Sequence, residues 1–298
     1  MLTACAIAPV KLRVLKHETN ADLHTLLTRA TVKPETADSK DALAHFIGRW
    51  KEDGRGGSGL IASSSENYRV TFVTGRSGTY SPDYFDQLQP AADFELEKLP
   101  HHMRNGIGVP LMALRENRHR DPLERFYPPE AITRPVTAIA TVKKVGAHQK
   151  EVRIELLCPL SHAETEVEGH RQPLAADFSV PWAALLAREG KLKQSQLLDF
   201  LSRTPSREPR LLLTEPYDPQ KEPLIMIHGL LSSPLVWATL SNELWADEAV
   251  RRRYQIWHYH YNTSAPALYS ARLLRAQLRE LSAIHLSLRG ARCCCRNS

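Results

Sequence analysis

A histidine and a glycine stand directly after an apolar run in the second half of the chain. The run is Leu224–Ile227, and the chain continues His228-Gly229-Leu230-Leu231-Ser232-Ser233-Pro234. Gly229 allows a sharp turn at the carboxyl end of a strand, which is where open α/β sheets bind their ligands. Such a turn can direct backbone N–H groups into a crevice, so the sequence predicts a ligand site built from main-chain donors.

Two further histidines lie on the next extended segment. His258 and His260 are two residues apart, which places both imidazoles on one face of a strand and makes them a candidate metal pair with His228. Because the segment holds no Cys, Asp or Glu, packing and hydrogen bonding are the favoured roles of these rings. We expect neither a metal nor an organic cofactor.

The first half of the chain contains no convincing catalytic constellation. His101, His102 and His119 lie among arginines without a ligand spacing, so a solvated loop is expected there. Gly106-Ile-Gly108 is only a fragment of a dinucleotide-binding motif. Ser58 and Ser77 have glycines nearby but miss the G-x-S-x-G spacing of a nucleophile elbow.

Alternating strands and helices are expected to position the His228 region. The continuous apolar run Leu224–Ile227 is typical of a strand buried on both faces of a parallel sheet. Ser232 or Ser233 can cap a helix that begins near Pro234, with an apolar stripe at residues 237, 240 and 244. A second strand is expected at 254–261 and a basic amphipathic helix at 267–281. The order strand, helix, strand, helix predicts the start of a doubly wound parallel sheet.

The segment before residue 216 shows a different pattern, in which predicted helices and strands do not alternate regularly. Apolar residues at helical spacing predict helices at 22–27, 41–47, 181–187 and 194–201. Period-two alternation predicts strands at 68–73, 138–142 and 152–157. We therefore expect a mixed α+β accessory domain over residues 1–215, a second domain over 216–285 and an anomalous tail rich in Arg and Cys over 286–298.

The residues from Leu224 to Trp237, followed by Arg251–Trp257, resemble the opening of the catalytic domain of bacterial α/β-hydrolases of the serine esterase and lipase type. Upstream, Phe126–Pro129, Pro173–Phe178 and Glu215–Pro219 are similar to the accessory region of a subgroup whose members are often predicted lipoproteins. The resemblance implies a doubly wound parallel α/β-hydrolase sheet after the accessory domain.

The resemblance also implies a function and a set of site residues. His228 and Gly229 would set an oxyanion loop in which the N–H of Leu230, or that of Leu231, binds the developing oxyanion. The substrate would be a small-molecule or lipid ester, cleaved through a serine acyl-enzyme without a metal or organic cofactor.

The chain departs from this family at the nucleophile. The family's G-x-S-x-G, acid and histidine follow the helix expected at 267–281, and in residues 282–298 no serine has flanking glycines. We expect that the chain as written is truncated or frame-shifted before its nucleophile, gives no burst with an ester and resists serine-directed fluorophosphonates. The alternative is a non-catalytic, envelope-associated binding module.

Composition and charge limit the class of protein and the partners that can be expected. The 298 residues are 42% hydrophobic and 24% charged, which is typical of a globular protein, and no apolar run approaches the roughly 20 residues of a membrane span. Nine arginines and one acid, Glu280, give residues 251–298 a charge of +8, so the net +6 leaves −2 for the rest. Nucleic acid is therefore not an expected partner. Leu and Arg segregate along 267–281, which suits either packing on the sheet, the favoured interpretation, or an anionic membrane surface.

Cysteines mark both ends of the sequence. Leu2-Thr3-Ala4-Cys5 has the form of a bacterial lipobox, although a working signal needs a basic and an apolar segment upstream. Lipidation of Cys5 would attach the protein to a membrane of the cell envelope; without it, a cytoplasmic location is expected. The triplet Cys293-Cys294-Cys295 fits neither a zinc knuckle nor a disulfide framework, because both need intervening residues.

Overall fold

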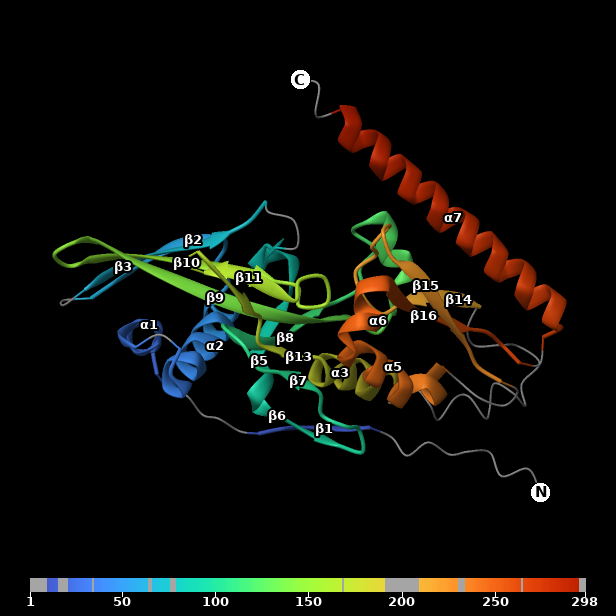
Figure 1. Cartoon of the computed structure of the whole chain (residues 1–298), viewed down its shortest axis with the longest axis horizontal. Coiled ribbons are helices and arrows are strands. Elements are labelled where there is room, and N and C mark those ends of the chain that lie inside the picture. The colour runs from blue at the N-terminus through green and yellow to red at the C-terminus, as the bar shows by residue number, and fades with distance from the viewer. Residues whose placement is uncertain are drawn as a thin grey trace. The chain divides into compact units, whose positions relative to one another are not determined.

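The structure is a computed structural model, and the chain divides into two compact units (Figure 1). The larger unit comprises described residues from 10 to 115 and from 133 to 184. The smaller unit comprises 116–132 and the described residues from 185 onward. The structure describes residues 10–15, 21–33, 35–63, 66–75, 79–167, 169–190, 209–229, 234–263 and 265–294.

Two capped helices cover part of the sheet of the larger unit. Helix α1 (Leu23–Val32) begins where the Asp22 carboxylate accepts from the Thr25 N–H at 2.7 Å. Helix α2 (Ala37–Glu52) is capped by Thr36, whose side chain accepts from the Ser39 N–H. It packs against strands β5 (Gln87–Pro90) and β8 (Val109–Arg115). Both contain the helical patterns expected from the sequence, which are therefore confirmed.

A curled, mostly antiparallel sheet of seven strands forms the centre of the larger unit. Strands β3 and β10 run parallel, whereas the pairs β2–β3, β9–β10, β4–β10 and β5–β8 are antiparallel. The three strands predicted from alternation lie within β3, β9 and β10, and one face of the sheet packs with α1 and α2 around Phe46, Trp50 and Tyr68. The strands in sheet order are β2 (Ser58–Ala62), β3 (Asn67–Val73), β10 (Gln149–Leu157), β9 (Ile132–Gly146), β8 (Val109–Arg115) and β5 (Gln87–Pro90), with β4 (Thr79–Tyr80) beside β10.

Short strand pairs and the start of one helix complete the larger unit. Helix α3 (Ser179–Gly190) begins in this unit, which ends at residue 184, and contains the helix predicted at 181–187. The helix predicted at 194–201 lies outside the described residues. The antiparallel pairs are β1 (Lys11–Val14) with β6 (Phe94–Glu97), β7 (Met103–Arg104) with β13 (Ala176–Asp177), and β11 (Glu164–Val167) with β12 (His170–Pro173).

The smaller unit contains a three-stranded sheet in the order β14-β16-β15. Strand β16 runs parallel to β15 and antiparallel to β14. Helix α7 packs its apolar side on this sheet, in a core that includes Leu211, Trp257 and Leu281. The elements are β14 (Arg210–Leu213), β15 (Glu222–Ile227), the 3₁₀ turn Pro234–Trp237, α5 (Ala238–Ala246), α6 (Glu248–Arg253), β16 (Tyr254–His260) and α7 (Ala267–Cys294).

The prediction of a doubly wound parallel α/β-hydrolase sheet is wrong. The larger sheet is mostly antiparallel, and the smaller one mixes a parallel pair with an antiparallel strand. The apolar run Leu224–Ile227 predicts a strand buried on both faces, but continuous hydrophobicity does not ensure such burial. Met226 is buried, but Ile227 is 48% exposed, and β15 is an edge strand of the described sheet.

Candidate functional site

The candidate site lies at the carboxyl ends of strands β15 and β16. Their parallel register pairs Met226 with His258 and Ile227 with Tyr259, so both strands end at the same edge of the sheet. The next residue after β15, His228, therefore meets the end of β16. Its ring lies 5.9 Å from that of His260 and stacks on Tyr261 at 4.5 Å, centroid to centroid.

The His228 ring is buried and held in one neutral tautomer. The Tyr261 backbone N–H donates to His228 Nε2 at 3.3 Å, so this nitrogen carries no proton. His228 Nδ1 lies 3.2 Å from the Gly229 carbonyl oxygen, which only accepts, so Nδ1 carries the proton. Burial lowers the pKa of His228. His228 therefore fixes the start of the loop and is not placed to act as a base.

A second contact holds the same loop through the backbone of His228 rather than through its imidazole ring. The Tyr261 hydroxyl donates to the His228 carbonyl oxygen at 2.8 Å. Tyr261 in turn stacks on Tyr259, whose hydroxyl donates to the Ser270 carbonyl oxygen in α7. Burial raises the pKa of Tyr259 to about 12, so it stays a donor at neutral pH. The loop is thus tied through two tyrosines to the first turn of α7.

Gly229 leaves open space beside the main chain. A Cβ built at Gly229 would meet no atom of the described residues within 4 Å, and Gly229 itself is exposed. The backbone at this point can therefore be approached by a ligand. Leu230 and Leu231, predicted to supply the oxyanion donors, lie outside the described residues, as do Ser232 and Ser233.

A buried serine and histidine meet beneath this edge. Ser241 Oγ in α5 and His258 Nε2 in β16 are 2.9 Å apart, which is the spacing of a nucleophile and its base. Both residues are buried, at 1% and 4% exposure, so neither reaches a substrate as the structure stands. The pair instead fastens α5 to β16. Among the described residues no group of three His, Cys, Asp or Glu is placed to hold a metal ion.

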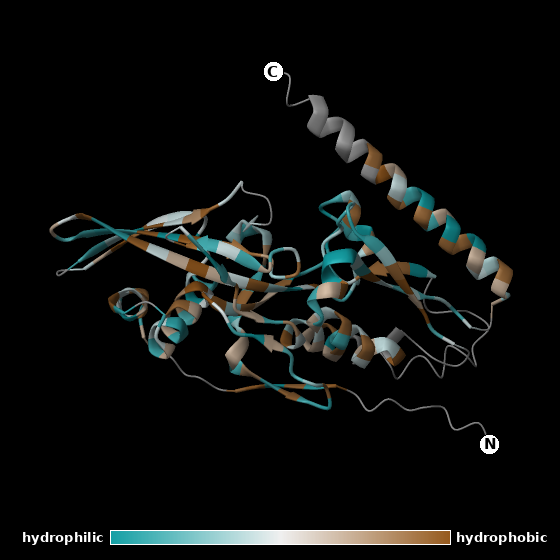
Figure 2. Ribbon diagram, viewed as in Figure 1, coloured by the Kyte–Doolittle hydropathy of each residue, from teal (hydrophilic) through white to brown (hydrophobic). Residues whose placement is uncertain are grey.

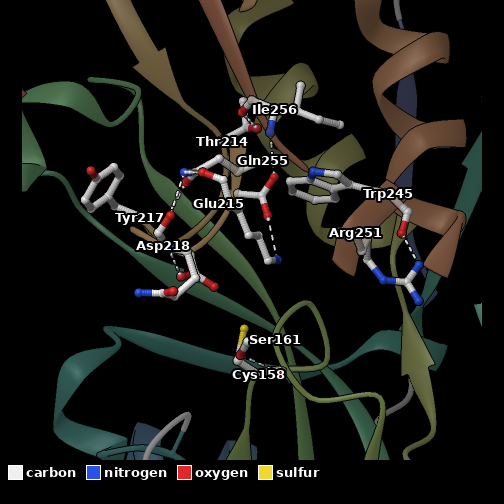
Figure 3. A network of polar contacts seen from close by, with 12 residues as sticks. Cys158, Ser161, Thr214, Glu215, Tyr217, Asp218, Trp245, Arg251, Gln255 and Ile256 are labelled. Atoms are coloured by element: carbon white, nitrogen blue, oxygen red, sulfur yellow. Dashed lines mark hydrogen bonds and ion pairs between the residues drawn. The ribbon is translucent and has the colours of Figure 1, made fainter. Parts of the chain in front are cut away.

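A network of polar side chains holds the other end of β16 (Figure 3). Beyond the last β14 pair, Leu213 with Trp257, the backbone of Ile256 is bound by side chains. Its N–H donates to the Glu215 carboxylate at 2.7 Å, and its carbonyl oxygen accepts from the Thr214 hydroxyl at 2.9 Å. Glu215 is 3% exposed and lies 3.8 Å from Lys221 Nζ. Sequence reasoning missed this network, because no local signal links Glu215 to a strand 41 residues away.

His101 of the larger unit lies in an exposed loop, as expected, and its ring is bound to a buried carboxylate. His101 Nε2 lies 2.7 Å from the carboxylate of Asp177, which is 3% exposed. The other oxygen of Asp177 accepts from the Ser179 and Val180 N–H groups at the start of α3. The hydrogen bond to Asp177 raises the pKa of His101. His101 thus contacts the residue that caps α3. The sequence around His101 does not indicate this non-local contact.

Further predicted residues lie beyond what the structure describes. Cys5 and Cys295 are outside the described residues, and Cys293 and Cys294 form the end of α7 without described side chains. Within the described part of the chain, no helix is both long and apolar enough to cross a membrane.

Comparisons with family models, with curated proteins and with solved structures found no match.

Proposed function

We propose that the protein has the substrate-binding half of a hydrolase of ester or related acyl substrates, in which the loop that begins at His228 and Gly229 binds the substrate's carbonyl oxygen. The observation that carries this proposal is the open main chain at Gly229, held by a buried histidine at the carboxyl end of a parallel strand pair. The resemblance of residues 224–237 to serine esterases and lipases supports it.

The physical basis is preorganisation of main-chain donors. Backbone N–H groups fixed before the reaction stabilise an oxyanion without reorganisation, and each is worth about 10²–10³ in rate. His228 holds the start of the loop in place, because three contacts with Tyr261 and one with Gly229 restrain this residue where the loop leaves the strand. Donors beyond Gly229 would then act on a carbonyl oxygen held in the open space.

The described residues assign no nucleophile. Ser241 has the partner that a nucleophile needs, but it is buried with His258. Loss of a catalytic serine or histidine costs about 10⁶ in rate, so oxyanion donors alone sustain little turnover. We expect no burst with a chromogenic ester and no fluorophosphonate labelling of this chain. Labelling of one serine would contradict that expectation of inactivity, support the hydrolase proposal and identify the nucleophile.

Binding tests the proposal independently of turnover. n-Butylphosphonate, a tetrahedral anion with a short acyl-like chain, is titrated into the ¹⁵N-labelled protein, and the Gly229 amide is assigned by its absence in Gly229→Ala. We expect the Gly229 resonance to shift with ligand. The added methyl group enters open space, so the fold should tolerate it. Because the methyl group then stands beside the main chain where the ligand approaches, the affinity should fall about tenfold.

A matched glycine provides the control. Within the described part of the chain, a Cβ built at Gly57 also meets no atom within 4 Å, and Gly57→Ala should leave the affinity unchanged. If the phosphonate moves other resonances but not that of Gly229, or if the Gly229→Ala affinity equals that of wild type, the proposal is wrong. A ligand that binds elsewhere would favour the non-catalytic binding module.

A further inference from the structure

Helix α7 is fixed about its own axis by one packed face. Leu274, Leu278 and Leu281 contact the core of the smaller unit. The Gln277 side chain accepts from the Leu211 N–H at 2.6 Å and donates to the Pro209 carbonyl oxygen at 2.7 Å, so it occupies the free edge of β14. The helix cannot rotate without breaking these contacts, and its opposite face is therefore held outward.

The outward face combines arginines with leucines. At 100° per residue, Leu268, Arg272, Arg275, Arg279 and Leu286 lie within an arc of about 60°, and we call this set the arginine face. All five are exposed, Leu268 by 84% and Leu286 by 67%. Figure 2 shows the resulting alternation of hydrophilic and hydrophobic residues along α7. Leucines at the two ends thus flank three arginines, along about 27 Å of helix.

The positive charge of the arginine face is not neutralised within the described protein. Arg272, Arg275 and Arg279 form no ion pair or hydrogen bond with a described residue. Glu280 is the one acid in the sequence of α7, and its carboxylate binds Arg125. Three guanidinium groups are therefore available to anionic groups outside the chain.

We propose that the arginine face docks on an anionic lipid surface, with the arginines on headgroup phosphates and Leu268 and Leu286 in the interface. Guanidinium groups bind phosphate in a bidentate manner, and exposed leucines gain energy on leaving water. A nucleic acid would satisfy the arginines but would leave the leucines in water. Shallow attachment of this kind fits an amphipathic helix that lies in the plane of the membrane.

Vesicle sedimentation of the full chain tests the proposal. Binding to phosphatidylcholine vesicles that contain about a third phosphatidylglycerol should be detectable at low salt and weaken at high salt, and pure phosphatidylcholine should bind little. The triple change Arg272→Gln, Arg275→Gln and Arg279→Gln should lower the partition coefficient about fivefold per arginine. The double change Leu268→Ser and Leu286→Ser should lower it about tenfold with the charge unchanged.

A triple change elsewhere controls for net charge. Lys143, Lys144 and Arg153 are exposed on the sheet of the larger unit, and their replacement by Gln removes the same three charges. Partitioning of this variant should stay within about twofold of wild type. Equal losses in both triple variants would overturn the proposal, as would a leucine double variant that binds normally. Binding of a duplex oligonucleotide that depends on the three arginines but not on the leucines would assign the face to nucleic acid instead.

Discussion

Two histidines show how surroundings set the protonation of one residue type in opposite directions. Burial lowers the pKa of His228, and both of its ring nitrogens are bound by backbone groups in the neutral form. The hydrogen bond to Asp177 raises the pKa of His101, which is partly exposed. The charged form is therefore disfavoured at His228 and favoured at His101, and only the first holds the candidate site.

The burial of His228 should make the loop sensitive to acid. Because the folded protein holds His228 below its ordinary pKa of about 6.5, stability is unaffected above that pH and falls as the pH drops towards the folded value. His228→Gln cannot titrate, so it should lose less thermal stability than wild type between neutral and mildly acidic pH. At neutral pH the variant should already be less stable by about 1–2 kcal/mol, since the amide replaces the contacts with Tyr261 imperfectly.

The measurement compares, for each protein, the change in unfolding midpoint over the same pH interval. Other histidines contribute equally to both proteins and cancel in the difference. An acid-induced loss of the same size in His228→Gln would show that protonation of this ring does not limit the fold.

At the scale of elements, the sequence predicts where helices and strands form better than it predicts which strands pair with each other. The alternation at residues 68–73 and 152–157 identifies two strands, but nothing in either indicates that they pair in parallel. Helix α5 shows a second limit. Its predicted stripe includes Leu240, which is 43% exposed, while the buried face is Ala238, Ser241, Asn242 and Trp245. Two polar residues on the packed side are invisible to a hydrophobic pattern.

The Glu215 network should be worth more to β16 than an exposed ion pair. Glu215→Ala removes the acceptor of the Ile256 N–H and the carboxylate beside the nearly buried Lys221, so we expect a loss of about 3 kcal/mol. Glu215→Gln keeps an acceptor and should cost less. Adding Lys221→Met to Glu215→Gln should then recover part of the loss, because no buried ammonium remains.

Denaturant unfolding and hydrogen exchange at the Ile256 amide measure these effects. The exposed pair of Glu222 with Arg253 is the control, and Glu222→Gln should cost less than about 1 kcal/mol. If Glu215→Ala and Glu222→Gln are equally mild, the buried network does not hold the strand.

At the scale of the whole molecule, the sequence predicts only part of the candidate site. The sequence indicates His228 and Gly229 because a histidine and a glycine after an apolar run form a local pattern. Tyr261 contacts His228 through its backbone N–H, its hydroxyl and its ring. It follows 33 residues later, and no local sequence pattern links it to the site. Such contacts depend on the parallel register of β15 and β16, which the chain establishes only on folding.

The two units have cores that can be perturbed separately. Phe46 is fully buried in a core built from the larger unit alone, and Leu213 in one built from the smaller unit alone. Phe46→Ala should cost about 3–5 kcal/mol and Leu213→Ala about 2–5 kcal/mol, since each leaves a cavity. Because a core stabilises mainly the elements that enclose it, Phe46→Ala should speed hydrogen exchange most in peptides from β3 and β10, and Leu213→Ala most in those from β14 and β16. Equal acceleration in both units by either change would show that they unfold together as one cooperative structure.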